Sequence, residues 1–379
     1  MVPPVDAVLQ RLGITPAIVD AFAEARAAGM RLARVAAQHR GGHVLLSSAG
    51  QFGGDHETDA VVELRADLAG RLRRAIAEDS AAGPAVGDWV ATTVAGERPS
   101  ATIHAVLPRR TKLSRKAAGR GASEQLVAAN VDRVFLVCPL DQPLNLRRIE
   151  RLLTIALESG AAASVVLTKV DLCADPAAAL ASLGVHTDRD GAAIPVHVIS
   201  SVSGAGLAAL DVYTHTPQTT ALIGASGVGK STLINRWLGH ERLPVAEVRD
   251  DGKGRHTTTH RELLVLPQGG LVIDTPGMRE LGLWRSDDGL QGAFADVTAL
   301  TEHCRFADCT HDKEPGCAVQ AAVAAGSLAP ERAASFAKLQ REQVHLDQER
   351  SVLGRTRARA ADRRLHKALK RHYQREGNE

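Results

Sequence analysis

The sequence predicts a multidomain α/β protein: an N-terminal antiparallel β-barrel, a central mainly parallel sheet covered by helices, and a C-terminal helical metal-binding domain. Three observations predict it. Short alternating apolar stretches separated by Gly, Pro and Asp occupy residues 31–115. Strand-like apolar runs alternate with helical stretches over residues 116–298. A Cys/His cluster and an increasingly basic helical tail fill residues 299–379, and the Ala-rich residues 1–30 read as a helical leader packed on its neighbour.

Composition restricts the class of protein. The chain has 379 residues, too many for one ordinary core, with 44% hydrophobic and 23% charged residues. These values exclude a disordered or fibrous chain. No apolar run approaches the ~18–20 residues of a membrane helix. The first residues lack the basic start and apolar block of a secretion signal, so we expect a cytoplasmic protein with reduced thiols and no membrane contact.

The first sheet is expected to be a small antiparallel barrel. Its apolar stretches are HVLLSS (43–48), DAVVEL (59–64), DWVATTV (88–94) and ATIHAVL (101–107). Barrels of this size bind RNA through a charged groove and stacking aromatics. This segment offers Phe52 and Trp89, and Trp89 reads equally well as a core residue.

The central region has the alternation of apolar and helical segments that is typical of a parallel sheet. Buried runs at 133–138, 163–169, 195–200 and 219–225 alternate with helical stretches such as 144–160, and runs at 263–266 and 271–274 follow. Continuous apolar strands separated by helices predict a mainly parallel sheet with helices on both faces.

A phosphate-binding loop follows the run at 219–225. The pattern G-x-x-x-x-G-K-[ST] is matched at every fixed position by Gly224, Ala225, Ser226, Gly227, Val228, Gly229, Lys230 and Ser231, with Thr232 next in the helix. Backbone N–H groups of such a loop surround phosphate oxygens, the lysine reaches the β and γ phosphates, and the serine hydroxyl ligates Mg²⁺. The alternative is a glycine-rich turn without a ligand, which the strand-to-helix context disfavours.

Two further segments suit the γ phosphate. Asp274-Thr275-Pro276-Gly277 ends a strand, where Asp274 can hold Mg²⁺ and Gly277 can present its N–H. The polar stretch 252–259 is expected to close over Mg²⁺ through one of Thr257, Thr258 and Thr259, with a plain surface loop as the alternative.

The position that often carries a water-orienting glutamine is Met278 here. His256, directly before Thr257, is the nearest candidate to hold the attacking water, and its alternative role is to dock the loop.

Guanine is selected by segments that precede the phosphate loop. Thr168-Lys169-Val170-Asp171 ends a strand; Asp171 can accept two hydrogen bonds from guanine, and the Lys169 stem can lie over the ring. Ser200 and Ser201 begin a second segment whose N–H groups can face guanine O6. Regulatory GTPases usually place the base motifs last, so the order here is circularly permuted, a change that leaves every spatial contact available.

With these motifs the sequence resembles the ribosome small subunit-dependent GTPase A proteins of bacteria over about residues 31–345. The residues that carry the resemblance are Pro84–Val90, Leu113–Lys116, Ala128–Asp132, the permuted motifs, and the segments Cys304–His311 and Glu314–Val319. The resemblance implies a five-stranded oligonucleotide/oligosaccharide-binding (OB) barrel, a permuted GTPase and a zinc domain. It also implies a role in late maturation of the small ribosomal subunit, with GTPase activity stimulated by that particle.

One residue departs from the family pattern. The base motif usually begins with Asn, and Thr168 stands there, so we expect weaker guanine binding with Asp171 keeping the main discrimination. Asp171 also disfavours a P-loop ATPase or kinase. The rival of a different class is an RNA-binding assembly factor that uses nucleotide only as a structural ligand.

The Cys/His cluster predicts one structural Zn²⁺ per chain. Cys304, Cys309, His311 and Cys317 supply three thiolates and one imidazole, a set that favours tetrahedral zinc. The alternatives are free cysteines in a loop, or His303 as the imidazole, although its adjacency to Cys304 makes that awkward.

The tail is basic. Residues 350–375 hold ten Lys or Arg and one acid, Asp362. A solvated helix face is the ordinary explanation of a charge run; with so few acids interleaved we favour contact with rRNA of the small subunit. The chain is expected to act as a monomer that binds GTP and GDP.

Overall fold

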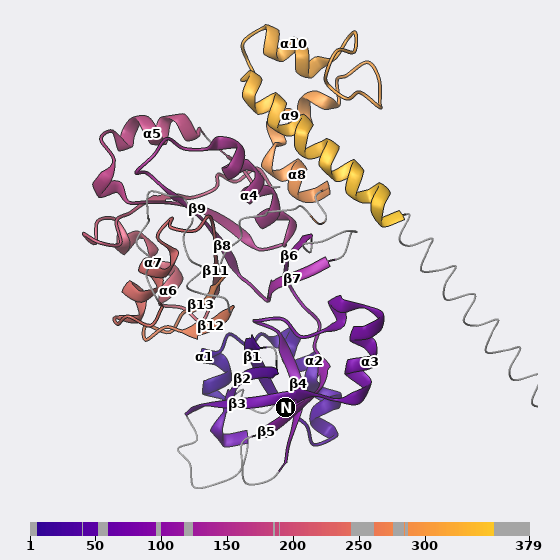
Figure 1. Cartoon of the computed structure of the whole chain (residues 1–379), viewed down its shortest axis with the longest axis vertical. Coiled ribbons are helices and arrows are strands. Elements are labelled where there is room, and N and C mark those ends of the chain that lie inside the picture. The colour runs from indigo at the N-terminus through magenta and orange to yellow at the C-terminus, as the bar shows by residue number, and fades with distance from the viewer. Residues whose placement is uncertain are drawn as a thin grey trace, which may run out of the picture.

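The computed structural model describes residues 6–39, 41–51, 60–95, 100–116, 124–184, 186–188, 190–243, 261–275, 284 and 287–351. Figure 1 shows three bodies along the long axis: the barrel with the N-terminal helices, the central sheet with its helices, and a helical C-terminal region. Among the described residues, no helix is long and apolar enough to cross a membrane.

The N-terminal body is a closed five-stranded barrel. Its strands are β1 (Arg31–His39), β2 (Gly42–Ser48), β3 (Val61–Leu68), β4 (Trp89–Ala95) and β5 (Ser100–Val106). The order β1-β2-β3-β5-β4 closes because β4 also pairs with β1, and only β3 and β5 run parallel. This is the five-stranded OB-type barrel expected from the sequence.

Helices surround this barrel. Helix α1 (Ala7–Arg11) contacts β2, α2 (Pro16–Ala27) contacts β1, and α3 (Gly70–Glu78) lies between β3 and β4 in the chain. Trp89 is only 1% exposed, so it is a core residue rather than a stacking platform. Phe52, the other expected aromatic, lies outside the described residues.

The central sheet is mainly parallel. Its order is β10-β9-β8-β11-β13-β12. The parallel strands are β8 (Arg133–Pro139), β9 (Ala162–Thr168), β10 (Val196–Val198), β11 (Thr219–Ile223) and β13 (Leu271–Asp274); β12 (Glu262–Val265) is antiparallel to β13. All five parallel strands therefore direct their carboxyl ends to the same edge, where ligands of open α/β sheets bind.

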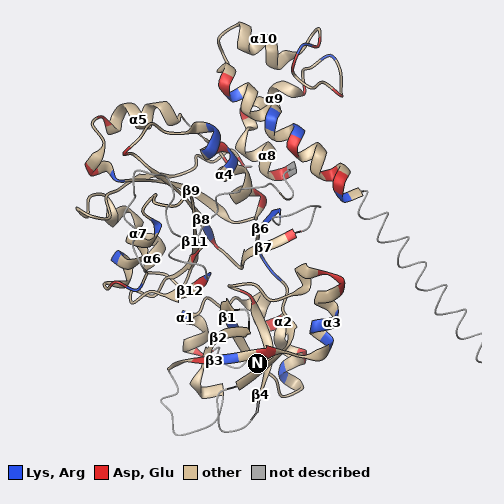
Figure 2. Cartoon of the chain, viewed as in Figure 1, with Lys and Arg blue, Asp and Glu red and all other residues tan. Residues whose placement is uncertain are grey.

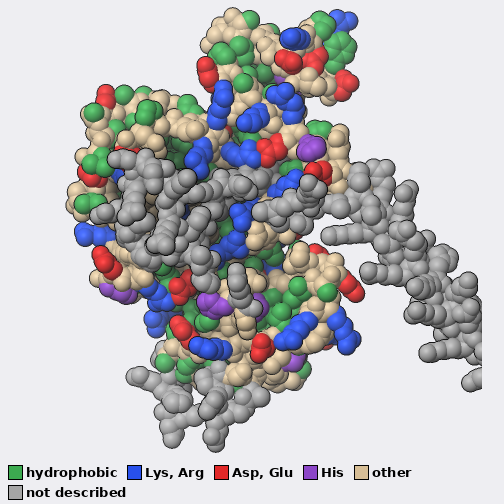
Figure 3. Space-filling model, viewed as in Figure 1, with side chains coloured by type: hydrophobic (Ala, Val, Ile, Leu, Met, Phe, Trp, Pro, Cys, Tyr) green, Lys and Arg blue, Asp and Glu red, His purple; other side chains and the backbone are tan. Residues whose placement is uncertain are grey.

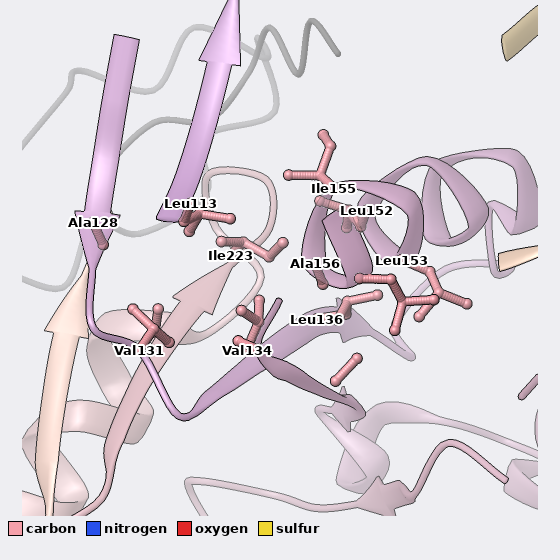
Figure 4. Close-up of a cluster of buried hydrophobic side chains, with 14 of the residues drawn as sticks. Leu113, Ala128, Val131, Val134, Leu136, Leu152, Leu153, Ile155, Ala156 and Ile223 are labelled. Atoms are coloured by element: carbon pink, nitrogen blue, oxygen red, sulfur yellow. The ribbon is translucent and has the colours of Figure 1, made fainter. Parts of the chain in front are cut away.

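Alternate residues of each strand face different helices. On β8, Val134 and Leu136 join the core under α4 (Leu146–Glu158), whereas Phe135 and Val137 join the core under α7 (Lys230–Leu238). Figure 4 shows Leu136 directed toward Leu152 and Ala156 of α4. The expected helices on both faces are thus present.

A β-hairpin shares the α4 face of the sheet. It consists of β6 (Lys112–Lys116) and β7 (Glu124–Ala129). Leu113 and Ala128 are fully buried, and Leu113 lies beside Ile223 of β11 in Figure 4. The hairpin thus contributes to the core that lies under α4.

Arg34 joins the barrel to the central sheet. This β1 side chain is 1% exposed and donates to the carbonyls of Leu12 at 2.6 Å, Gly87 at 3.2 Å and Asn130 at 3.1 Å, and to Thr219 Oγ1 at 2.9 Å. Burial lowers its pKa to about 10, so the guanidinium stays charged at neutral pH. Thr219 begins β11, the strand that leads into the phosphate loop, and the barrel is therefore fixed to that strand.

The C-terminal region is helical. It contains α8 (Asp287–Ala293), α9 (Ala295–Thr301), α10 (Ala318–Ala324) and a helix over residues 330–351. Arg332 of the last helix holds Glu150 of α4 at 2.9 Å and Asp296 of α9 at 2.6 Å. The domain limits expected from composition remain predictions, and two of them fall inside β6 and α9.

Candidate nucleotide site and metal centre

The phosphate loop lies between β11 and α7. Gly224 needs to be glycine, because a Cβ there would meet the carbonyl oxygen of Val137 at 2.4 Å. Gly227 and Gly229 have φ values of 78° and 97°, which favour glycine. The loop therefore packs against β8 and curls tightly before the N-terminus of α7, the geometry that exposes N–H groups to an anion.

Lys230 folds back over this loop. Its Nζ donates to the carbonyls of Gly224 at 3.0 Å and Ala225 at 2.7 Å. Burial lowers the pKa of Lys230 to about 8, the charge of Asp274 raises it, and the charge of Arg148 lowers it. The ammonium group is thus held over the loop, where phosphate oxygens bind in proteins of this kind.

Asp274 ends β13 beside this lysine. It pairs in register with Leu222 of β11 and is 2% exposed; burial raises the pKa of its carboxyl, and the Lys230 charge lowers it. The next residue, Thr275, donates from its hydroxyl to the carbonyl of Leu222. Helix α7, whose first turn carries Ser231, packs against β13. A buried carboxylate and a serine hydroxyl on these two elements form a donor set that suits Mg²⁺.

Thr168 connects the base motif to the phosphate loop. Its hydroxyl lies 2.6 Å from the carbonyl oxygen of Val228 and 3.4 Å from that of Cys138, and the residue is 1% exposed. The expected cost of this threonine for guanine binding stays a prediction. What the sequence did not indicate is that the hydroxyl bonds to the phosphate loop.

The residues after Thr168 present the base-binding groups. Lys169 takes a left-handed conformation, φ 60°, and its Nζ pairs with Asp141 at 2.6 Å. Asp171 lies on a short 3-10 helix, Val170–Leu172, and is exposed. The lysine stem is thereby fixed by a carboxylate that sequence reasoning missed, and the Asp171 carboxylate is accessible to a base.

The second base segment lies against the first. The N–H of Val170 donates to the carbonyl of Ile199 at 3.2 Å. Ser200 is buried, and its Oγ accepts from the N–H groups of Val202 at 3.2 Å and Ser203 at 3.0 Å. Ser201 Oγ is buried without a hydrogen-bond partner among the described residues. The loop is thus shaped by the Ser200 hydroxyl.

Most of the predicted nucleotide residues therefore gather at one edge of the sheet. The base motif follows β9, the phosphate loop follows β11, and Asp274 ends β13. The switch residues His256 and Thr257, together with Gly277 and Met278, lie outside the described residues, so their roles remain predictions.

The four predicted metal ligands form one cluster. The ligand atoms of Cys304, Cys309, His311 and Cys317 all lie within 4.8 Å of one another. Nδ1 of His311 lies 3.6 Å from Sγ of Cys304 and 3.7 Å from Sγ of Cys317. The imidazole of the cluster is therefore His311 and not its alternative, His303. Three thiols and one imidazole at these separations fit a tetrahedral metal ion.

Two residues that sequence reasoning missed shape the metal loop. The Glu314 carboxylate accepts from the Thr310 hydroxyl and from the backbone N–H groups of Thr310, Asp312 and Lys313, and these bonds hold its pKa at about 2. Gln320 donates to the carbonyl of His311 at 2.6 Å. The only sequence signal for the role of Glu314 in shaping the loop was its position between the metal ligands.

The fold and this site define a GTP-binding switch protein with circularly permuted motifs. The RsgA GTPase family model matches residues 106–284. The small ribosomal subunit biogenesis GTPase RsgA of Opitutus terrae is 47% identical over 89% of this chain and 90% of its own length. The protein of the same name from Methanosarcina acetivorans is 43% identical over 77% and 78%. The chain belongs to the RsgA GTPase family and is a GTPase.

Solved structures support the fold. YjeQ from Thermotoga maritima superposes with a TM-score of 0.57 at 26% identity, covering 83% of this chain and 99% of that one. YloQ, described as a circularly permuted GTPase, superposes with a TM-score of 0.55, covering 83% of this chain and 96% of that one. At 23% identity this likeness supports the fold alone. The predicted family, fold class and GTPase activity are confirmed.

Proposed function

We propose that this GTPase acts in late maturation of the small ribosomal subunit, binding the particle and its rRNA with GTP and leaving it on hydrolysis. The observation that carries the proposal is the family membership, since relatives of nearly equal length bear the name of that process. A cytoplasmic, monomeric protein that alternates between GTP and GDP fits this role.

The nucleotide would be held by three groups of residues. Asp171 would accept from guanine N1–H and N2–H₂ with Lys169 against the ring, while Ser200 and Ser201 order the loop near O6. The loop Gly224–Ser231 would surround the phosphates, with Lys230 on the β and γ oxygens and Thr232 continuing α7. Since Thr168 bonds to that loop, base and phosphate binding would be linked.

Two metals are implied. Ser231 and Asp274 would hold Mg²⁺, which neutralises charge developing on the phosphates. Cys304, Cys309, His311 and Cys317 would hold one structural Zn²⁺, a closed four-ligand set that leaves no position for substrate. Thr257 would close on Mg²⁺, Gly277 would bond the γ phosphate, and His256 would hold the attacking water.

The zinc region is joined to the GTPase close to its nucleotide edge. Glu150 and Arg332 pair at 2.9 Å across the contact, and Arg151 pairs with Glu342. These contacts link α4, which follows β8 directly, to the helix over residues 330–351. A change at the γ phosphate would reach the zinc region through α4 as well as through residues after Asp274.

The test is the rate of GTP hydrolysis against added small ribosomal subunits. We expect a slow intrinsic rate that rises and saturates with the particle. The alternative is an RNA-binding assembly factor for which nucleotide is structural. A chain that binds subunits in a GTP-dependent way and shows no stimulated turnover would favour that alternative.

A further inference from the structure

Two arginines from distant parts of the chain meet on the β6–β7 hairpin. Arg115 lies on β6, and its Nε donates to Oε1 of Gln125 at 3.0 Å. Arg261 lies directly before β12, and its Nη1 donates to the carbonyl of Leu126 at 3.3 Å. Gln125 and Leu126 are consecutive residues of β7, so both guanidinium groups are anchored at the same place on one strand.

Neither arginine has a carboxylate partner among the described residues. The lysines on either side of Arg115 do: Lys112 pairs with Glu124 at 2.7 Å and Lys116 with Glu349 at 2.6 Å. Figure 2 shows the corresponding colours, blue on β6 and red at the start of β7. The acids of this region are therefore used by the lysines.

The two arginines also act on one another. Burial lowers the pKa of Arg261, and the positive charge of Arg115 lowers it further. Two like charges in a half-buried setting repel, and the repulsion is stronger than in water because the effective dielectric constant is lower. An anion between them would relieve that repulsion.

The pair borders the nucleotide edge of the sheet. Glu262, the first residue of β12, is in register with Asp274, the last residue of β13. Arg261 therefore lies at the level of Thr275, beyond the carboxyl end of β13. Figure 3 shows Lys and Arg side chains gathered across the middle of the visible face, between the barrel and the helical C-terminal region.

We infer that Arg115 and Arg261 form a phosphate-binding site, separate from the phosphate loop, between the β6–β7 hairpin and β12. Guanidinium is the cation suited to this ligand, since its planar N–H groups match two phosphate oxygens at once. The anchoring bonds to Gln125 and Leu126 use one donor of each arginine, and the other donors make no hydrogen bond to a residue that the structure describes. The phosphate belongs either to an RNA backbone or to a small molecule such as inorganic phosphate.

The experiment compares Arg115→Gln, Arg261→Gln and the double variant with the unchanged full-length chain. Lys112→Gln is the matched control, because it removes one positive charge from the same strand at a residue that has a carboxylate partner. Arg115→Lys with Arg261→Lys keeps the charge and removes the paired N–H geometry. Thermal melting of every variant with the bound GTP analogue verifies that it is folded.

The RNA arm measures binding of a fluorescent single-stranded 12-nucleotide RNA at several salt concentrations. If the phosphate is that of RNA, the double glutamine variant loses about tenfold in affinity and its salt slope falls by roughly one to two phosphate contacts. Lys112→Gln stays near the unchanged chain. An equal loss in Lys112→Gln would show only general charge attraction and would overturn the site.

The small-molecule arm measures thermal stabilisation by inorganic phosphate, with the phosphate loop saturated by a non-hydrolysable GTP analogue. If the source is free phosphate, the unchanged chain is stabilised, the double variant is not, and RNA affinity is equal in both. Unaltered behaviour of the double variant in both arms rejects the inference.

The RNA arm rests on the proposed contact with rRNA, and the two failures are distinguishable. Absence of RNA binding by the unchanged chain counts against the proposed function, and the small-molecule arm then decides the site alone. RNA binding that is the same in the unchanged chain and the double variant, together with equal stabilisation of both by inorganic phosphate, counts against the site and leaves the proposed function standing.

Discussion

The hydroxyl of Thr168 donates a hydrogen bond to the carbonyl oxygen of Val228, 2.6 Å away and inside the phosphate loop. Thr168 belongs to the base-binding motif and Val228 to the phosphate loop, and both residues are nearly fully buried. The bond holds the loop against the end of β9, so a change in one motif is felt by the other.

Thr168→Val should therefore weaken binding of GTP and GDP by about tenfold each, since the Val228 carbonyl loses its partner in a buried place. Valine keeps the shape of threonine, which separates the lost bond from lost packing. Titration with fluorescent nucleotides measures both constants. Thr168→Asn is the companion variant, because its amide can donate to the same carbonyl; equal affinities in all three chains would show that the bond is not used.

Asp171→Asn should reduce GTP affinity by roughly 100-fold, because the carboxylate would accept two hydrogen bonds from guanine and the amide cannot accept both. The same variant should prefer xanthosine triphosphate, whose ring offers an acceptor to the new N–H. Competition between GTP, xanthosine triphosphate and ATP measures the change. Guanine preference that persists in the variant would contradict the assignment of Asp171.

Cys309→Ser should lose the metal and destabilise residues 300–320, because a structural metal site contributes its binding free energy to folding. Elemental analysis of the purified chain should give one zinc per molecule, and thermal unfolding reports the loss. Cys173→Ser is the control, since this free cysteine lies outside the cluster. A metal-free chain with unchanged melting would contradict the prediction.

His256→Ala should leave binding of GTP and of the small subunit intact and abolish stimulated hydrolysis. The position that usually holds the water-orienting glutamine is Met278, so we expect His256 to hold the attacking water instead. The readouts are particle binding by sedimentation and phosphate release with and without subunits. Loss of binding together with turnover would make His256 a residue that docks the loop. Full stimulated activity would remove it from the mechanism.

The barrel should lose stability in mild acid because of His43. This β2 side chain is 7% exposed, and neither ring nitrogen has a hydrogen-bond partner among the described residues. Burial lowers its pKa, the charge of Asp67 raises it, and His39 lowers it. The unfolded chain therefore binds the proton first, and stability is present above about pH 6.5 and falls below it.

His43→Leu should remove that part of the acid sensitivity and leave stability at pH 7.5 equal or higher, because the ring nitrogens make no compensating bonds. Urea unfolding at pH 7.5, 6 and 5 measures the slope. His104→Leu, on β5 of the same barrel with its ring bonded to Thr93 at 2.8 Å, is the control that should keep the slope. A slope unchanged by His43→Leu would show that other groups carry the acid response.

Some elements of the fold could not be predicted from the sequence, for physical reasons. Strand β1 has six consecutive buried residues, 32–37, and the charged Arg34 is one of them, so it lacks the alternation that marks a half-buried strand. Helix α3 and the β6–β7 hairpin are short and carry many charges, and their side chains pack only because other elements cover them. The Leu113–Lys116 and Ala128–Asp132 motifs were recognised in the sequence, but the sequence did not predict that their strands pair as a hairpin.

The sequence by itself determined the class of chemistry and the fold class. A phosphate loop, an Asp-x-x-Gly motif and a Cys₃His set need particular atoms at fixed spacing along the chain, and continuous apolar runs mark buried parallel strands whatever surrounds them. Tertiary structure decided which distant residues meet: Thr168 with Val228, Arg34 with Thr219, Arg332 with Glu150, and Arg115 with Arg261 beside one strand. Such contacts depend on how whole helices and strands pack together. The pattern of residues within one segment therefore does not predict which distant residue will contact it.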